Sequence, residues 1–237
     1  MEFLHFREPV SAWSHALGLL LALPATLILL RRARGDRTKQ LGFLVFGLTL
    51  AACYAASALF HGIHAAPAWL HWYNTADHAG IYLLIAGTIT PVALILLEGR
   101  WRWAILVSTW GFAAAGITLC LTVRGLPLAV STGLYLAMGW GVLACYVELT
   151  RVLPPGGLRL AVLGGILYSA GALLNVLHWP VLWPGIVGPH EVFHVFVLGG
   201  SLCHFLFALT VVAPYRRPIP DAAAPAAVLC PTPLVAR

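Results

Sequence analysis

The sequence predicts an all-α membrane protein, a bundle of seven transmembrane helices. Of its 237 residues, 60% are hydrophobic and only 9% are charged. Soluble domains carry roughly 25% charged residues, so this chain has too few charges to cover a water-facing surface. Seven apolar stretches each reach about 20 residues, the length that a helix needs to cross the hydrocarbon core. Because only helices and closed barrels satisfy their backbone hydrogen bonds in lipid, these long apolar runs indicate helices.

The seven predicted helices follow one another with short connections. The first, 11–30, is too long for the core of a signal peptide and leads into another span, so we interpret it as a transmembrane helix. The others are expected at 41–60, 78–98, 102–123, 130–150, 158–177 and 191–213. Residues 1–213 thus form one membrane domain of antiparallel neighbours. The Pro- and Ala-rich tail at 214–237 is expected to be disordered.

The distribution of positive charge predicts the orientation in the cell membrane. The N-terminus and the even-numbered loops hold only Arg7 and Arg124 of the 14 Lys and Arg residues. The other 12 lie in or beside the odd-numbered loops and in the C-terminal tail. The positive-inside rule therefore places the C-terminus in the cytoplasm and the N-terminus outside. Since the net charge of +6 is explained by topology, we expect no nucleic-acid binding.

Ionisable side chains at membrane depth are costly, so each one marks a candidate functional site. Seven stand out: Glu8, His15, His61, Asp77, His190, His194 and His204. Following the chain back and forth across the membrane places all but His204 in one layer near the extracytoplasmic face. His204 lies about 15 Å deeper, at 1.5 Å of rise per residue, and is expected to form a buried hydrogen bond.

Three histidines of this layer form a metal-site hypothesis. His190 and His194 are four residues apart, so both imidazoles point from one helix face. His61 supplies a third nitrogen, and a fourth position stays open, which is the pattern of catalytic zinc. Asp77 could hold the zinc-bound water or accept its proton, and Ser57 could be a second-shell partner or a donor to substrate. The alternative is that these histidines only hydrogen-bond between helices.

The chain also carries motifs that resemble a known family. They are Glu8-x5-Ser14-His15, Ser57-x3-His61, the run DHAGIYLLIAGTITP from Asp77, and HEVFH from His190 followed by GSLCHF. Together they resemble the hemolysin III branch of the progestin and adipoQ receptor family, which includes the adiponectin receptors. The resemblance implies seven helices and a zinc ion bound by His61, His190 and His194. It also implies that Asp77 holds the zinc water and that Ser57 lies close by.

The resemblance implies a function at the membrane. The wider superfamily includes alkaline ceramidases, the bacterial branch takes its name from haemolytic activity, and it is linked to membrane-fluidity homeostasis. The expected function is therefore zinc-dependent hydrolysis of a lipid amide or ester in lipid homeostasis, with Asp77 as base and Ser57 beside zinc as an oxyanion donor. Expected partners are membrane lipids and a lipid amide substrate. The alternatives are a non-enzymatic sensor or receptor with structural zinc, and a haemolytic pore.

Two other functions are disfavoured by particular residues. The string from His190 to His194 fits the HExxH pattern of zinc proteases. However, no glycine follows three residues after His194 and no later helix holds an acidic residue, so a protease is not expected. A retinal protein needs a lysine in a late helix, and the only lysine, Lys39, lies in the first loop.

The remaining polar and aromatic residues have structural interpretations. Glu148 and Arg151, three apart at a helix end, are expected to form an interfacial ion pair. His64, His71 and His178 are expected in loops on the side of the site. Trp69, Trp72, Trp179 and Trp183 are expected to be interfacial anchors.

Overall fold

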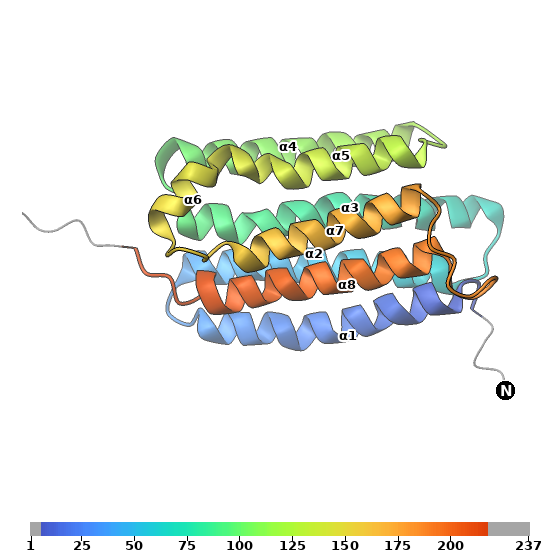
Figure 1. The fold of residues 1–237 in the computed structure, drawn as a ribbon, viewed down its shortest axis with the longest axis horizontal. Coiled ribbons are helices and arrows are strands. Elements are labelled where there is room, and N and C mark those ends of the chain that lie inside the picture. The colour runs from blue at the N-terminus through green and yellow to red at the C-terminus, as the bar shows by residue number, and fades with distance from the viewer. Residues whose placement is uncertain (1–5, 218–237) are drawn as a thin grey trace, which may run out of the picture.

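Seven membrane-spanning helices lie side by side in the structure, a computed structural model that describes residues 6–217 (Figure 1). The first four spans are α1 (Pro9–Arg32), α2 (Arg37–Gly62), α3 (Pro67–Leu96) and α4 (Gly99–Thr122). The last three begin with α5 (Leu128–Trp140), α7 (Arg159–Val176) and α8 (Pro189–Phe207). All seven are long and apolar enough to cross a membrane, which confirms the predicted all-α seven-helix bundle.

The third span starts earlier than its apolar stretch predicts. α3 begins at Pro67 rather than near 78, and proline at the first helical position is favourable because its missing N–H has no partner there in any case. The Trp, His and Asn side chains of its first turns lower the local hydropathy, which is why the apolar run alone begins later. His71 was expected in a loop and lies instead in these first turns, which extend past the neighbouring helices (Figure 1).

Two spans contain segments that are not α-helical. The fifth passes from α5 through a 3₁₀ turn, η1 (Gly141–Cys145), into α6 (Tyr146–Val152). The seventh ends in a π-helical turn, η2 (Ala208–Val212), after α8. Such turns change the helix pitch without ending the span. Hydropathy records only that the residues are apolar, so neither turn was predicted.

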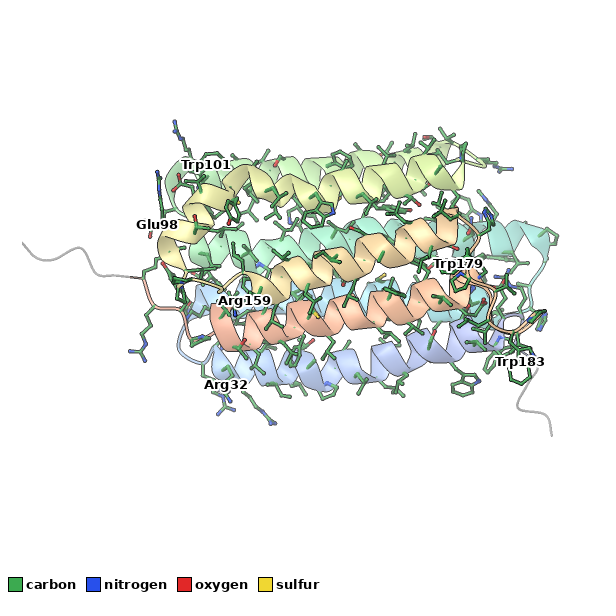
Figure 2. All side chains as sticks on the ribbon, viewed as in Figure 1. Arg32, Glu98, Trp101, Arg159, Trp179 and Trp183 are labelled. Atoms are coloured by element: carbon green, nitrogen blue, oxygen red, sulfur yellow. The ribbon has the colours of Figure 1, made fainter. Side chains whose placement is uncertain are left out.

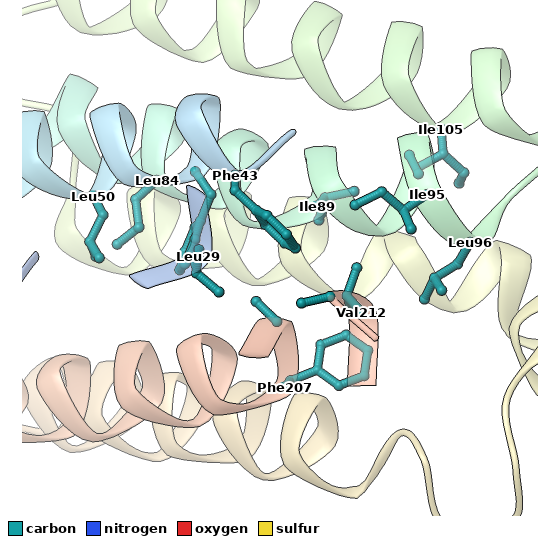
Figure 3. Close-up of a cluster of buried hydrophobic side chains, with 14 of the residues drawn as sticks. Leu29, Phe43, Leu50, Leu84, Ile89, Ile95, Leu96, Ile105, Phe207 and Val212 are labelled. Carbon is teal, nitrogen blue, oxygen red and sulfur yellow. The ribbon is translucent and has the colours of Figure 1, made fainter. Parts of the chain in front are cut away.

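The buried core lies between α1, α2, α3 and α8 (Figure 3). Leu29, Phe43, Leu96 and Val212 are almost completely buried there. Helices in lipid associate through close packing of small residues rather than through a hydrophobic driving force. Gly80 of α3 illustrates this, because a Cβ at that position would lie only 3.0 Å from the Cα of Cys53 on α2.

The two ends of the bundle carry different side chains. Figure 2 shows Arg32, Glu98 and Arg159 at one end and Trp179 and Trp183 at the other. The four tryptophans predicted as anchors, Trp69, Trp72, Trp179 and Trp183, are all more than half exposed.

The last described residues contact the arginine-rich end of the bundle. The Lys39 Nζ donates to the Ala213 carbonyl at 2.8 Å, and the Arg217 guanidinium donates to the Leu94 carbonyl at 2.8 Å. The tail predicted to be disordered begins at 214. Its residues 218–237 lie outside the described part of the chain.

Gly80→Val tests the close packing of α2 against α3. The added side chain would meet the Cys53 backbone, and overpacking of this kind costs about 1–3 kcal/mol. We expect a lower thermal unfolding midpoint in detergent. Gly111→Val on α4 is the matched control, because no heavy atom lies within 4 Å of a Cβ built there. Equal unfolding midpoints for the two variants would contradict this account of the packing.

Candidate metal centre

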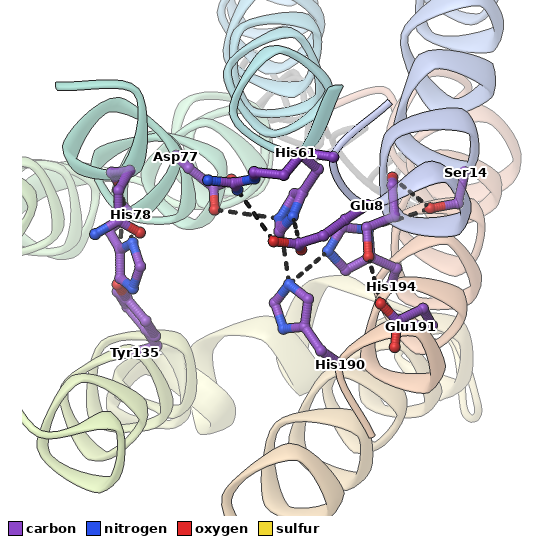
Figure 4. Close-up of polar contacts among 12 residues, drawn as sticks. Glu8, Ser14, His61, Asp77, His78, Tyr135, His190, Glu191 and His194 are labelled. Carbon is purple, nitrogen blue, oxygen red and sulfur yellow. Dashed lines mark hydrogen bonds and ion pairs between the residues drawn. The ribbon is translucent and has the colours of Figure 1, made fainter. Parts of the chain in front are cut away.

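Three histidine side chains, His61, His190 and His194, converge where α2 ends and α8 begins (Figure 4). His61 lies in the last turn of α2, and His190 and His194 lie in the first turns of α8. The Nε2 of His190 is 3.2 Å from the Nε2 of His61 and 3.1 Å from the Nε2 of His194. Nitrogens bound to one tetrahedral zinc at about 2.0–2.1 Å are about 3.3 Å apart, so this spacing suits a single ion. The cluster can therefore hold a metal.

Glu8 determines which nitrogen of the neutral His61 ring carries the proton. The Nδ1–H of His61 donates to Oε2 of Glu8 at 2.5 Å, and the backbone N–H of Glu8 donates to the His61 carbonyl at 2.9 Å. With the proton on Nδ1, the Nε2 lone pair faces the other two rings. The hydrogen bond from His61 lowers the pKa of the Glu8 carboxyl, which keeps it an acceptor. A carboxylate behind a metal-binding histidine orients the ring and raises its basicity.

Ser14 places the proton of the His194 ring on Nδ1 in the same way. Its hydroxyl donates to the Ser11 carbonyl at 2.9 Å, so its one hydrogen is already used. The Ser14 oxygen lies 3.2 Å from Nδ1 of His194 and must accept the proton of that ring. The Nε2 of His194 is then a free lone pair that points at His190. The Nε2 of His190 lies between this lone pair and that of His61, so one cation could be bound by all three nitrogens.

Glu191, the glutamate of the HExxH string, has a structural role. Its Oε2 accepts from the backbone N–H of Gly188 at 2.9 Å, which caps the start of α8. Its Oε1 accepts from the Ser11 hydroxyl at 3.0 Å, which joins α8 to α1. Both oxygens are thus engaged away from the histidines. This differs from the arrangement that a zinc protease needs for its general base.

Asp77 and Ser57 lie beside the three histidines. The Oδ2 of Asp77 is 3.8 Å from the Nε2 of His61, too far for a direct hydrogen bond. Ser57 is almost completely buried one turn before His61 on α2. Both side chains line the cavity next to the cluster. The structure therefore brings Asp77 and Ser57 to the same place as the three histidines, as the sequence predicted for this site.

His15 packs against the cluster rather than joining it. Its ring stacks on that of His194, with centroids 3.7 Å apart and planes 16° apart. It also contacts the Tyr54 ring at 4.9 Å between centroids. Within residues 6–217, neither ring nitrogen of His15 has a hydrogen-bond partner. The stacked His15 ring thus restricts the His194 ring to its plane.

An internal cavity of about 230 Å³ opens from the cluster into the bundle. Asp77 and His190 line the cavity beside the three histidines, and His204 and Phe207 line it further towards the arginine-rich end of the bundle. Its walls come mainly from α3, α5, α7 and α8, and most of the lining side chains are aliphatic or aromatic. The polar cluster therefore faces a long apolar space, which sequence reasoning did not predict because the lining residues are spread over most of the chain.

Three further groups of residues were assigned roles from the sequence. The Arg151–Glu148 pair is confirmed, with 2.9 Å between Nη1 and Oε1. His64 and His178 lie in loops, as predicted. His204 was expected to form a buried hydrogen bond, but the contact that the structure shows for its ring is stacking on Tyr168.

His78 lines the cavity and was missed. It follows Asp77 directly in the DHAG motif, so that motif could have identified it.

Known proteins resemble this chain along nearly the whole membrane domain. A family model described as haemolysin-III related matches residues 3–205. Hemolysin-3 of Bacillus cereus is 36% identical over 209 residues, which cover 87% of this chain and 92% of the relative. A Hemolysin-3 homolog of Bacillus subtilis (strain 168) is 35% identical, covering 85% and 92%. Heptahelical transmembrane protein ADIPOR2 of Oryza sativa subsp. japonica is 30% identical, covering 77% and 85%.

Metal binding should depend on the histidines and, to a lesser degree, on Glu8. We expect His194→Ala to abolish binding because it removes one of three ligands. Glu8→Ala leaves the ligands but frees the His61 ring, so the affinity should fall about 10- to 100-fold, as for other partners behind a ligand. Competition with a chromophoric chelator, together with metal content by mass spectrometry, measures both effects.

Glu148→Ala is the matched control for Glu8→Ala. It also removes a glutamate from an ion pair, but that pair lies in α6, far along the chain from the histidines. Its metal affinity should equal that of the wild type. Wild-type affinity in Glu8→Ala would refute the role assigned to Glu8, and full metal content in His194→Ala would refute the ligand set.

Proposed function

The chain belongs to the haemolysin-III related family, and we propose that it is a zinc-dependent hydrolase of a lipid amide or ester. The observation that carries this proposal is the position of the three-histidine cluster at the mouth of the apolar cavity. A polar reaction centre beside an apolar space suits a substrate with a carbonyl head and a long chain. The superfamily that the sequence motifs resemble includes alkaline ceramidases, which supports the same substrate class.

The donor set favours zinc. Three imidazole nitrogens that face one point suit zinc, and an ion with three protein ligands keeps a position for water or substrate. Bound there, zinc would activate a water molecule as nucleophile and polarise the substrate carbonyl. The burial of His61 and His194 excludes bulk solvent, which strengthens electrostatic interactions at the site.

The chain's own residues supply the proton transfers. Asp77 is close enough to the cluster to accept a proton from the attacking water, and it then returns that proton to the leaving amine or alcohol. The Ser57 hydroxyl donates to the carbonyl oxygen as negative charge develops there. The carbon–nitrogen or carbon–oxygen bond breaks, and the products are a fatty acid and an amine or alcohol. The aliphatic cavity walls hold the acyl chain throughout.

The non-enzymatic alternatives use the same cluster differently. A sensor or receptor with structural zinc would need the three histidines but not Asp77 as a base. A haemolytic pore would need polar side chains along a path across the membrane, whereas most of the cavity lining is aliphatic or aromatic. We therefore favour the hydrolase, acting on membrane lipids.

The positive-inside rule further supports a site that faces the outside of the cell. The arginines that bias the orientation, such as Arg32 and Arg159, lie at the end opposite Trp179 and Trp183 (Figure 2). The cluster lies near the tryptophan-bearing end. On this proposal, a headgroup enters from the extracytoplasmic leaflet and the C-terminus is cytoplasmic.

Asp77→Asn separates catalysis from metal binding. We expect zinc content to stay at the wild-type level because no ligand is lost, while turnover of a lipid amide falls at least about 100-fold without the base. Release of fatty acid from short- and long-chain ceramides, measured by mass spectrometry, gives the rate. Glu98→Gln is the control, an exposed carboxylate near the opposite end whose loss should leave the rate unchanged.

Two outcomes would contradict the proposal at different points. Undiminished turnover in Asp77→Asn would refute its role as base. Zinc-loaded wild-type protein that hydrolyses no lipid amide or ester would refute the hydrolase and favour the sensor.

The orientation is tested with two introduced cysteines. His64→Cys lies in the loop between α2 and α3, and Thr38→Cys lies at the exposed start of α2. Both are made in a chain with Cys120→Ser and Cys230→Ser, because the other native cysteines are buried. A membrane-impermeant maleimide added to intact cells should label His64→Cys and spare Thr38→Cys until the membrane is opened. The reverse labelling pattern would place the cluster on the cytoplasmic side.

A further inference from the structure

A second polar group lines the cavity far from the metal cluster. His204 follows His194 by ten residues on α8, which places it about 15 Å further along the helix axis. It lines the same cavity as the metal cluster, near Phe207 and away from the three histidines. None of the roles proposed above for the cluster uses this histidine.

The His204 ring is held in a fixed position. It stacks on Tyr168 of α7, with centroids 5.5 Å apart and planes 15° apart. It also packs against Gly164, where a Cβ would come within 2.8 Å of the His204 Nε2. A glycine and an aromatic face on α7 thus leave room for one orientation of this imidazole.

The neighbouring polar side chains are satisfied by one another. The Tyr54 hydroxyl donates to Ser201 at 2.7 Å, and the Tyr168 hydroxyl lies 2.9 Å from the same Ser201 oxygen. Trp140 donates to Ser169 at 2.9 Å. His204 differs from these residues, because the contact that the structure shows for its ring is the stacking on Tyr168 rather than a hydrogen bond. The ring is half-buried and lines the cavity, so it can hydrogen-bond a polar group that a ligand brings there.

A water molecule is a poor candidate for that partner. A buried water needs two to four polar groups around it. The side chains that pack on His204 or line the space beside it, such as Tyr168 and Phe207, present mainly aromatic and aliphatic surface. Among the described residues, Thr88 is the one other polar side chain that lines this space, and its hydroxyl already donates to the Leu84 carbonyl. A hydroxyl carried by an acyl chain needs only one such partner, since its chain already occupies the apolar space.

We propose that the cavity binds long-chain acyl groups that carry a hydroxyl near the middle of the chain, and that His204 hydrogen-bonds this hydroxyl. The head of such a ligand lies at the three-histidine cluster and its hydroxyl lies about 15 Å deeper. This assignment rests on the proposed function only for the position of the head. It narrows the substrate class to lipids with a hydroxylated acyl chain.

Binding of matched fatty acids to the full-length protein tests the proposal. Oleic acid and ricinoleic acid share chain length and double bond, and ricinoleic acid adds a mid-chain hydroxyl. Calorimetric titration into detergent-solubilised, zinc-loaded protein should give an affinity up to about tenfold higher for ricinoleic acid, the effect of one net hydrogen bond. An α-hydroxylated oleic acid, with its hydroxyl beside the carboxyl, should gain none of this preference. Equal affinities for oleic and ricinoleic acid would overturn the proposal.

His204→Phe identifies the partner. Phenylalanine keeps a ring to stack on Tyr168 but cannot hydrogen-bond, so the preference for ricinoleic acid should disappear while oleic acid binds as before. Undiminished preference in this variant would overturn the role of His204. If His204→Phe does not fold, His204→Gln serves instead, and it should retain part of the preference.

This test is independent of catalysis. A protein that prefers ricinoleic acid but hydrolyses no lipid amide would keep the inference and refute the hydrolase. A protein that hydrolyses ceramides but binds oleic and ricinoleic acid equally would refute the inference and keep the hydrolase.

Discussion

The site depends on one constraint, that the Nδ1 protons of the candidate metal-binding histidines need acceptors inside the bundle. A polar atom left unpaired in the interior of the bundle costs far more than one at a surface. Glu8 and Ser14 take the Nδ1 protons of His61 and His194, which leaves the Nε2 atoms aimed at each other and at His190. The same constraint that makes polar groups costly thus leaves the Nε2 lone pairs of His61 and His194 facing His190.

This constraint also explains why α1 matters to a site whose ligands lie on α2 and α8. Glu8, Ser11 and Ser14 all come from the start of α1 and reach His61, Glu191 and His194 in turn. Glu191 then caps the start of α8, the helix that carries two of the three ligands. The ligands on two helices are therefore positioned from a third. A metal site of this kind is a property of the assembled bundle rather than of any single motif.

Much of the architecture could be predicted because hydropathy is a strong signal in membrane proteins. The seven spans and the layer of Glu8, His15, His61, Asp77, His190 and His194 follow from span length and direction alone. The early start of α3 could not be predicted, because its first turns contain Trp, His and Asn and lack an apolar pattern. The environment of His204 was also missed, since its stacking on Tyr168 depends on how α7 is rotated against α8. Rotation about a helix axis leaves no trace in a hydropathy pattern that is apolar all round.

The double attachment of Glu8 has a practical consequence for handling the protein. Its backbone and its side chain both bond to His61, directly ahead of α1. A fused domain that pulls on this segment would disturb the residue that orients a ligand ring. At the opposite end of the bundle, Arg217 attaches the chain to the carbonyls at the end of α3, so a pull there acts far from the three histidines.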